Sequence, residues 1–290
     1  MQLHGLIVLW GITSIIGRWI NVPAVELVFY RTALAAAAMG VIIYARGRSV
    51  KLPWKQAVGL LLTGFLIGLH WILFFLSAKI ASASICLAGL ATCTLWTALL
   101  MPIFFRTFRW KVYELVLGII MLGALYVIFR FQADHKVGLI IALVSALFAT
   151  VFIIINGLLI KRYHFLVMTF YELAGACLFC VLFTPAYLAW FSDSGQFEVP
   201  ATFKDWGWLL VLSLGCTVLA FTGYVELLNR MDVFSINLAS NLEPVYGMIL
   251  AALLDGDWKK MNLGFYGGSA IILAAIVAYP WFKRWDAGRL

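Results

Sequence analysis

The sequence has few charged residues. Only 12% of its 290 residues are Asp, Glu, Lys or Arg, whereas 64% are hydrophobic, and the mean hydropathy is +1.00. A soluble domain of this length carries about 25% charged residues, so the composition excludes an ordinary protein with a water-covered surface. Because helices satisfy their own backbone groups inside a bilayer, we predict an all-α polytopic membrane protein.

Cysteine and histidine are also scarce, with five and four residues. All five cysteines fall within apolar runs, and the pair Cys177-x-x-Cys180 has no further ligands nearby in the sequence. His70 is the only histidine deep in an apolar run, and no second histidine or cysteine accompanies it at helical spacing. We therefore predict no metal site, no cofactor and no disulfide.

The chain lacks any cluster of charges within its apolar runs. Its net charge of +8 would favour nucleic-acid binding in a soluble protein, but here the basic residues lie mostly in short connections, where they set membrane orientation. Their bias predicts a bacterial inner-membrane protein with both termini in the cytoplasm. Arg31 is the only arginine well inside a run, which disfavours a nucleotide or phosphate substrate. We infer neither a nucleic acid nor an obligate protein partner.

Ten apolar stretches are long enough to cross a bilayer, since about 20 residues at 1.5 Å each cover the roughly 30 Å hydrocarbon core. Their ranges are 3–20, 24–45, 56–78, 81–105, 112–131, 136–160, 165–190, 207–228, 233–254 and 262–282. The first stretch lacks a basic start and a cleavage site of small residues, so we expect a retained helix rather than a signal peptide.

The ninth stretch contains the most unusual residues for a membrane helix. Glu243 is followed at once by Pro244, and Asn237 and Asn241 add to a polar face. Pro244 lacks an N–H, so it predicts a kink and a freed carbonyl near Ser240. A carboxylate beside a broken backbone favours a substrate or ion site. The alternative is a glutamate that only packs against a neighbouring helix.

Two short patterns recur in the second half of the chain in the same order. Phe29-Tyr30-Arg31 matches Phe170-Tyr171-Glu172, and residues 84–88 (SICLA) match residues 235–239 (SINLA). A unit of five helices that is repeated once must enter the membrane upside down the second time. We predict ten transmembrane helices as two inverted five-helix repeats, residues 1–133 and 134–290, that form one membrane unit.

Several short motifs stand in a characteristic order along these stretches. They are Trp10-Gly11, Arg31, Leu242-Glu243-Pro244-Val245 and the run 253–257 (LLDGD). In this combination the chain resembles the EamA-type branch of the drug/metabolite transporter superfamily. The resemblance implies a carrier with a central cavity that alternates its access, and members of the family commonly export amino acids, other metabolites or drugs. The first half departs from the pattern, because Thr92 and Cys93 stand opposite Glu243 and Pro244.

Ionisable residues within the stretches are the first candidates for a binding site. Arg31 either snorkels to the outer surface or presents its planar donors to a substrate carboxylate, to Glu172 or to Glu243. Because Glu172 holds the matching position in the other half, an Arg31–Glu172 pair is a further alternative. His70 is either a hydrogen-bonded packing residue or a group that titrates during transport.

Polar and aromatic side chains at depth extend this set. The repeat would place the threonine stripe of the fourth stretch, from Thr92 to Thr97, opposite the stripe from Asn237 to Glu243 across the cavity. Aromatic residues either fill space or line a cavity, since Tyr and Trp also carry a polar atom. The predicted substrate-binding residues are Glu243, Asn241, Asn237, Arg31, Tyr246, Trp10, Trp96, His70, Glu172 and Tyr171.

The sequence thus predicts a secondary active transporter, expected to be an exporter, of small amphipathic organic solutes with amino acids first among them. Protons are a further candidate partner, carried by Glu243 or His70. One alternative is an exporter of drug-like or heterocyclic metabolites. Another is an intramembrane lipid-modifying enzyme, but no convergent set of nucleophile, base or metal ligands supports it.

Overall fold

The computed structural model describes residues 2–105, 110–129, 136–255 and 263–287. Every regular element in these residues is a helix. Each of the ten predicted stretches coincides with one helix or with consecutive helices. Within the described residues, six segments are long and apolar enough to cross a membrane: Ala24–Ala45, Trp54–Ile80, Ile85–Phe104, Lys136–Leu159, Phe165–Trp190 and Phe203–Leu227. The chain is therefore a multi-pass integral membrane protein.

The first half contains seven of the helices. They are α1 (Gln2–Gly11), α2 (Thr13–Trp19), α3 (Ala24–Ala45), α4 (Trp54–Ile80), α5 (Ala83–Ala91), α6 (Cys93–Phe104) and α7 (Val112–Phe129). The second half contains the others. They are α8 (Lys136–Leu159), α9 (Phe165–Trp190), α10 (Phe203–Leu210), the π-helix η2 (Val211–Leu219), α11 (Ala220–Leu227), α12 (Val233–Ser240), α13 (Leu242–Asp255) and α14 (Leu263–Ala287).

Three stretches are broken near their middle. The breaks fall at Ile12 between α1 and α2, at Thr92 between α5 and α6, and at Asn241 between α12 and α13. The break at Asn241 confirms the interruption predicted from Pro244, which stands in the first turn of α13, where no intrahelical N–H is needed. Asn237 therefore lies on α12, Glu243 lies on α13, and Asn241 lies between these two helices.

The stretches predicted over 3–20 and 81–105 are each interrupted by one residue, although no proline marks either break. A threonine hydroxyl stands at each of them instead. Thr13 Oγ1 donates to the Trp10 carbonyl at 2.6 Å, and Thr92 Oγ1 donates to the Gly89 carbonyl at 2.7 Å. Such a hydroxyl satisfies a carbonyl at the end of a helix, so the backbone can turn there without an orphaned acceptor.

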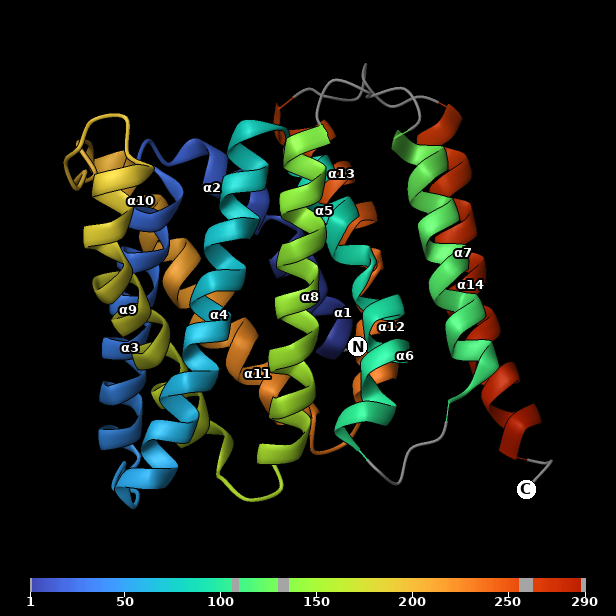
Figure 1. Ribbon diagram of the computed structural model, residues 1–290, viewed down its shortest axis with the longest axis horizontal. Helices are drawn as coiled ribbons and strands as arrows, with labels where there is room; N and C mark the ends of the chain where they lie inside the picture. Colours follow the sequence, from blue (N-terminus) through green and yellow to red (C-terminus); the bar gives the residue numbers. More distant parts are fainter. Residues whose placement is uncertain (1, 106–109, 130–135, 256–262, 288–290) are drawn as a thin grey trace.

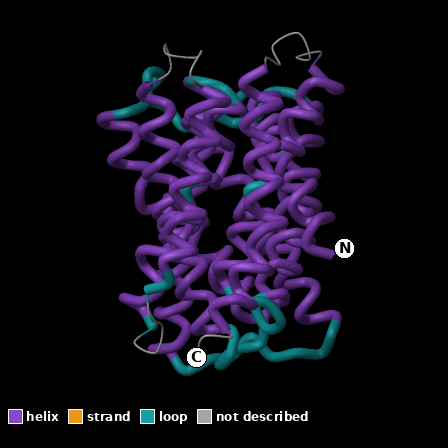
Figure 2. The backbone as a smooth tube through the Cα atoms, turned by 90° about the vertical axis from the view of Figure 1, so that its right-hand side faces the viewer, coloured by secondary structure: helices purple, strands orange, loops and turns teal. Residues whose placement is uncertain are grey.

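The helices stand roughly parallel in one bundle (Figures 1 and 2). α4 packs between α9 and α8, and α3 packs on α9. α7 and α14 pack on each other at the other end of the bundle (Figure 1). The broken helices lie between these groups, because α5 packs on α8 and α13 packs on both α1 and α5. The breaks therefore lie inside the bundle rather than at its edge.

Glycines allow two of these helix crossings. A Cβ added to Gly64 on α4 would collide with the backbone of α9 at the Glu172 carbonyl, and one on Gly175 would collide with the backbone of α4. A Cβ on Gly11 of α1 would lie 3.0 Å from the amide nitrogen of Gly247 on α13. Such close contacts drive helix association in membranes, where apolar burial between helices contributes little.

Candidate functional site

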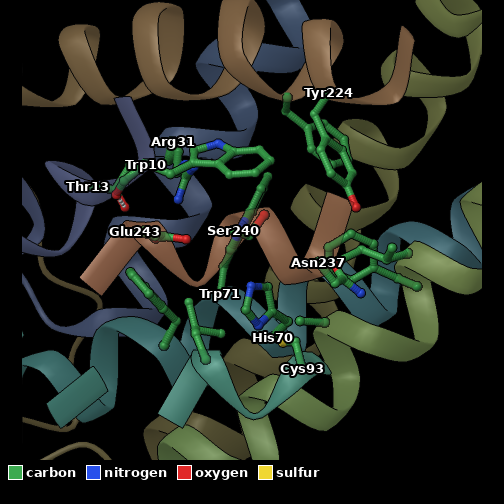
Figure 3. Close-up of a pocket in the computed structure, with 16 residues that line it drawn as sticks. Trp10, Thr13, Arg31, His70, Trp71, Cys93, Tyr224, Asn237, Ser240 and Glu243 are labelled. Carbon is green, nitrogen blue, oxygen red and sulfur yellow. Dashed lines mark hydrogen bonds between the residues drawn. The ribbon is translucent and has the colours of Figure 1, made fainter. Parts of the chain in front are cut away.

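A cavity of about 90 Å³ lies among the broken helices. Its walls come from both halves of the chain, and they are Trp10, Thr13, Arg31, His70, Trp71, Phe74, Leu90, Cys93, Ala149, Phe152, Ile153, Phe221, Tyr224, Asn237, Ser240 and Glu243. Figure 3 shows Trp10, Arg31 and Glu243 on one side of this space and His70 and Cys93 on another. The lining combines aromatic side chains with polar and charged ones in similar numbers.

Glu243 reaches the cavity because the ninth stretch is broken. It lies in the first turn of α13, directly after the break, and is 7% exposed. Within the described part of the chain, its carboxyl group has no hydrogen bond or ion pair, so its oxygens are open to the cavity. The amino-terminal end of a helix favours a negative charge, and α13 therefore stabilises an anion at this position.

Arg31 lines the same cavity from α3 and is only 2% exposed. Its Nε donates to Thr217 Oγ1 at 2.6 Å, and its guanidinium carbon lies 4.1 Å from the centroid of the Trp71 ring. Thr217 lies in the π-helix η2, and its hydroxyl donates in turn to the Leu212 carbonyl at 2.8 Å. The hypothesis that Arg31 snorkels to the surface is wrong, because stacking and a buried hydroxyl hold it inside the bundle.

The proposed Arg31–Glu172 pair is also wrong. Glu172 is fully buried on α9, and the hydrogen bond that reaches it comes from Asn156 Nδ2 to Oε2 at 3.4 Å. Among the described residues, no ion pair within 4.0 Å involves Arg31 with either Glu172 or Glu243. The two residues hold matching places in the recurring sequence patterns, but different neighbours surround them.

His70 lines the cavity from α4 and is held by Ser145 on α8. His70 Nδ1 lies 2.8 Å from Ser145 Oγ and 3.0 Å from the Ser145 carbonyl. Ser145 Oγ donates back to the His70 carbonyl at 2.9 Å. This reciprocal bonding ties α4 to α8 and favours the interpretation of His70 as a packing residue.

The two predicted polar stripes bond to each other directly, which corrects the expectation that they face each other across the cavity. Asn237 Nδ2 donates to Thr97 Oγ1 at 2.7 Å, and Asn241 Nδ2 donates to Thr94 Oγ1 at 2.6 Å. Asn237 still lines the cavity, whereas Asn241 does not. These bonds therefore join the two broken helices directly.

Five of the ten predicted binding residues line this cavity: Glu243, Arg31, His70, Trp10 and Asn237. The other five do not. Tyr246 Oη lies 3.1 Å from His4 Nδ1, Tyr171 Oη donates to the Val50 carbonyl at 2.9 Å, and Trp96, Asn241 and Glu172 are in contact with other helices. A binding role for each of the ten stays a prediction.

Sequence reasoning did not single out Thr13, Phe152, Phe221 or Ser240 as lining residues. Aromatic residues make up 16% of the chain, so an individual phenylalanine carries no signal of its own. Thr13 and Ser240 each stand beside a helix break, at Ile12 and Asn241. A break that the sequence shows could have pointed to Ser240, but the break beside Thr13 has no proline to reveal it.

Comparisons with known proteins agree with this architecture. Residues 136–279 match the model of the EamA-like transporter family. The pseudopaline exporter CntI of Pseudomonas aeruginosa, in strains UCBPP-PA14 and PAO1, is 29% identical over 201 residues. The match covers 67% of this chain and 65% of the exporter, just under two thirds of that relative's length. These matches support an EamA-type transporter of the drug/metabolite transporter superfamily.

The fold also matches a solved structure. The alignment with a crystal structure covers 98% of this chain and 97% of the chain in that structure, with a TM-score of 0.75 and 20% sequence identity. At this identity the likeness shows the arrangement of the helices alone.

Proposed function

We propose that this protein is a secondary active exporter of small zwitterionic organic solutes, with amino acids first among them. One observation carries the proposal: Arg31 and Glu243 line one aromatic-walled cavity without pairing with each other. An amino acid carries a carboxylate that suits the planar guanidinium of Arg31 and an ammonium that suits the carboxylate of Glu243. The aromatic walls suit the apolar part of such a solute.

The broken helices beside the cavity support transport by alternating access. In this mechanism helices move apart so that the solute enters and leaves the cavity from one side of the membrane at a time. The broken helices α5–α6 and α12–α13 provide places at which such motion can occur.

We further propose that the two halves, residues 1–133 and 134–290, are inverted repeats. The helices with the matching sequence patterns support this: α3 and α9 lie side by side and run in opposite directions in Figure 1. The fourth and ninth stretches are both broken near their middle. We also propose that both termini lie on the cytoplasmic side of an inner membrane, because the connections on that side carry more of the basic residues.

A second candidate substrate class comes from the relatives. The matching proteins are named as exporters of pseudopaline, and the aromatic residues of the lining also suit drug-like or heterocyclic metabolites. These solutes share the site and the direction of transport with the first proposal, so the substrate panel of the experiment decides between them.

The test is counterflow uptake of labelled solutes into proteoliposomes, with wild type and Glu243→Gln. The panel contains amino acids, their amine-only and carboxylate-only analogues, and pseudopaline. Zwitterions should exchange best. Glu243→Gln should lower their exchange by about ten- to a hundredfold, because a hydrogen bond to a charged group contributes about 1.5–3 kcal/mol. Glu226→Gln is the matched control, since Glu226 pairs with Arg230 at 3.5 Å outside the cavity.

Each outcome changes the proposal in a defined way. If the Glu243→Gln protein exchanges amino acids like wild type, Glu243 does not bind the solute. If wild type exchanges only pseudopaline or heterocycles, the carrier stands and the amino-acid substrate is wrong. Exchange of none of these solutes, in either direction, contradicts the transport proposal itself.

A further inference from the structure

A second buried polar site lies on the same face of α8 as the cavity, one turn further along the helix. Ala149, Phe152 and Ile153 of α8 line the cavity, and Asn156 follows at the next position on that face. Asn156 and Glu172 of α9 are both 0% exposed, and Asn156 Nδ2 donates to Glu172 Oε2 at 3.4 Å. Neither residue lines the cavity.

The pair is one hydrogen atom short of full hydrogen bonding. Two other oxygens of the same two side chains, Glu172 Oε1 and Asn156 Oδ1, are buried and have no hydrogen-bond partner among the described residues. Both are acceptors when Glu172 is ionised, so neither can satisfy the other. A proton on Oε1 would donate to Oδ1 and complete a cyclic acid–amide pair with two hydrogen bonds.

The surroundings also disfavour a charge on Glu172. The helices packed on α9 are α3, α4 and α11, and α8 supplies Asn156. Within the described parts of these helices, Glu172 interacts electrostatically with one titratable group, the neutral phenol of Tyr224. No cationic side chain in these parts interacts with Glu172. An isolated carboxylate without a cation is costly in a membrane interior, and protonation removes that cost.

From this geometry we propose that Glu172 and Asn156 form a proton-binding site, occupied in the present conformation and emptied when the helices move. This inference rests on the proposed transport function, because it names the proton as the ion coupled to transport. It assigns that proton to Glu172 rather than to Glu243 or His70. Binding adds one proton to Oε1, and release transfers that proton to water.

The position of the pair gives the proton a route to water. Along α8, Phe152 and Ile153 line the cavity, whereas Ile155 and Leu159 line a groove of about 430 Å³ at the end of α4 that bears Lys55. Asn156 lies between these two sets. Tyr224 lines the cavity from α11, and its buried hydroxyl group also lacks a partner. A small separation of α8 from α9 would therefore open the pair to water from one side or the other.

The test is infrared difference spectroscopy of the full-length protein in lipid, recorded as the pH is raised. Wild type should show a carboxylic-acid C=O band at neutral pH that disappears at alkaline pH. Glu172→Gln should lack this band. Glu243→Gln and the surface variant Glu226→Gln should keep it. Asn156→Ala should keep the band but shift it to higher frequency, because Nδ2 no longer donates to Oε2.

The spectra can overturn the proposal. If the Glu172→Gln spectrum equals that of wild type, Glu172 holds no proton. If the band is present at every pH, the proton never leaves and the group is only structural. If added Na⁺ removes the band, the site binds a metal cation instead. Should Glu172→Gln fail to fold, the band shift in Asn156→Ala still decides whether the acid is paired with the amide.

Transport measurements then separate this inference from the proposed function. In wild type, a pH gradient should drive accumulation of the solute above the level reached by counterflow, and Glu172→Gln should lose that excess. If wild type transports nothing but the band titrates, the transport proposal fails and the proton site stands. If the solute accumulates equally in both proteins under a pH gradient, the carrier stands and Glu172 does not couple protons to it.

Discussion

The two broken helices beside the cavity share a backbone design and differ in chemistry. Both stop for one residue, at Thr92 between α5 and α6 and at Asn241 between α12 and α13. The Thr92 hydroxyl donates to the Gly89 carbonyl of its own helix. The Asn241 amide donates to the Asn237 and Leu238 carbonyls of its own helix and also to Thr94 of the other broken helix.

The two breaks supply different chemical groups to the region around the cavity. The break at Thr92 is satisfied locally and adds no charge to the cavity. The break at Asn241 is satisfied by a longer side chain that also joins the two helices, and it is followed by Glu243 in the first turn of α13. One half of the chain thus supplies hydroxyl acceptors, and the other supplies the bridging amides and the carboxylate.

The largest effect that separates the two breaks is expected for Asn241→Leu. The substitution removes three hydrogen bonds and leaves Thr94 and two carbonyls without this donor, so the free energy of unfolding should fall by about 2 kcal/mol. Thr92→Val is the matched control and should cost about 0.5 kcal/mol, since it removes one local bond. Equilibrium unfolding in mixed micelles measures both. Equal losses would mean that the two breaks are equivalent.

Much of this architecture could be predicted from the sequence because apolar runs are a strong signal. The ten stretches coincide with helices of the structure, and Pro244 indicated the interruption in the ninth. The breaks at Ile12 and Thr92 could not be predicted, since they depend on a hydroxyl bond and on packing rather than on proline. The π-helix η2 could not be predicted either, because no short sequence pattern indicates a π-helix.

The candidate site was predictable only in part. Arg31 and Glu243 stand out because ionisable residues are rare in apolar runs, and both line the cavity. Their partners depend on helix rotation, which the sequence leaves open, so the Arg31–Glu172 pair was expected wrongly. Asn156 was not among the predicted site residues. It is an isolated amide in an apolar run, and this feature of the sequence could have indicated the second polar site.

The residues that cap the starts of α5 and α12 should stabilise the protein by similar amounts near neutral pH. Their contributions to the free energy of unfolding should differ in how they change with pH. Ser82 Oγ accepts the Ile85 amide at 3.1 Å, and Asp232 Oδ1 accepts the Ser235 amide at 2.8 Å. Substitution of either residue by alanine should cost about 1 kcal/mol near neutral pH. Unfolding measured over a pH series then compares the two caps.

Asp232 has a lowered pKa, and this gives the sign of the pH effect. Burial acts to raise the pKa of Asp232, but hydrogen bonds from Lys283 and Ser235 outweigh it and hold the pKa below its ordinary value of 3.8. The cap is therefore fully present above the pKa of the unfolded chain and is lost as pH falls through the lower, folded-state pKa. The cost of Asp232→Ala should shrink on acidification, whereas that of Ser82→Ala stays constant. An identical decline for both would show that Asp232 is not the titrating cap.

The smallest effect is the coupling between the two broken helices at Asn237 and Thr97. A double-mutant cycle with Asn237→Leu and Thr97→Val isolates the bond from Asn237 Nδ2 to Thr97 Oγ1, and its coupling energy should be about 0.6 kcal/mol, the average for such bonds in membranes. A control cycle of Asn237→Leu with Ser82→Ala should give no coupling, because Ser82 caps α5 by a bond of its own. Coupling at Asn237–Thr97 that matches the control would mean that the helices are held by packing alone. The bridging amides would then serve mainly to satisfy the broken backbone, and the two breaks would differ only in the charge that follows them.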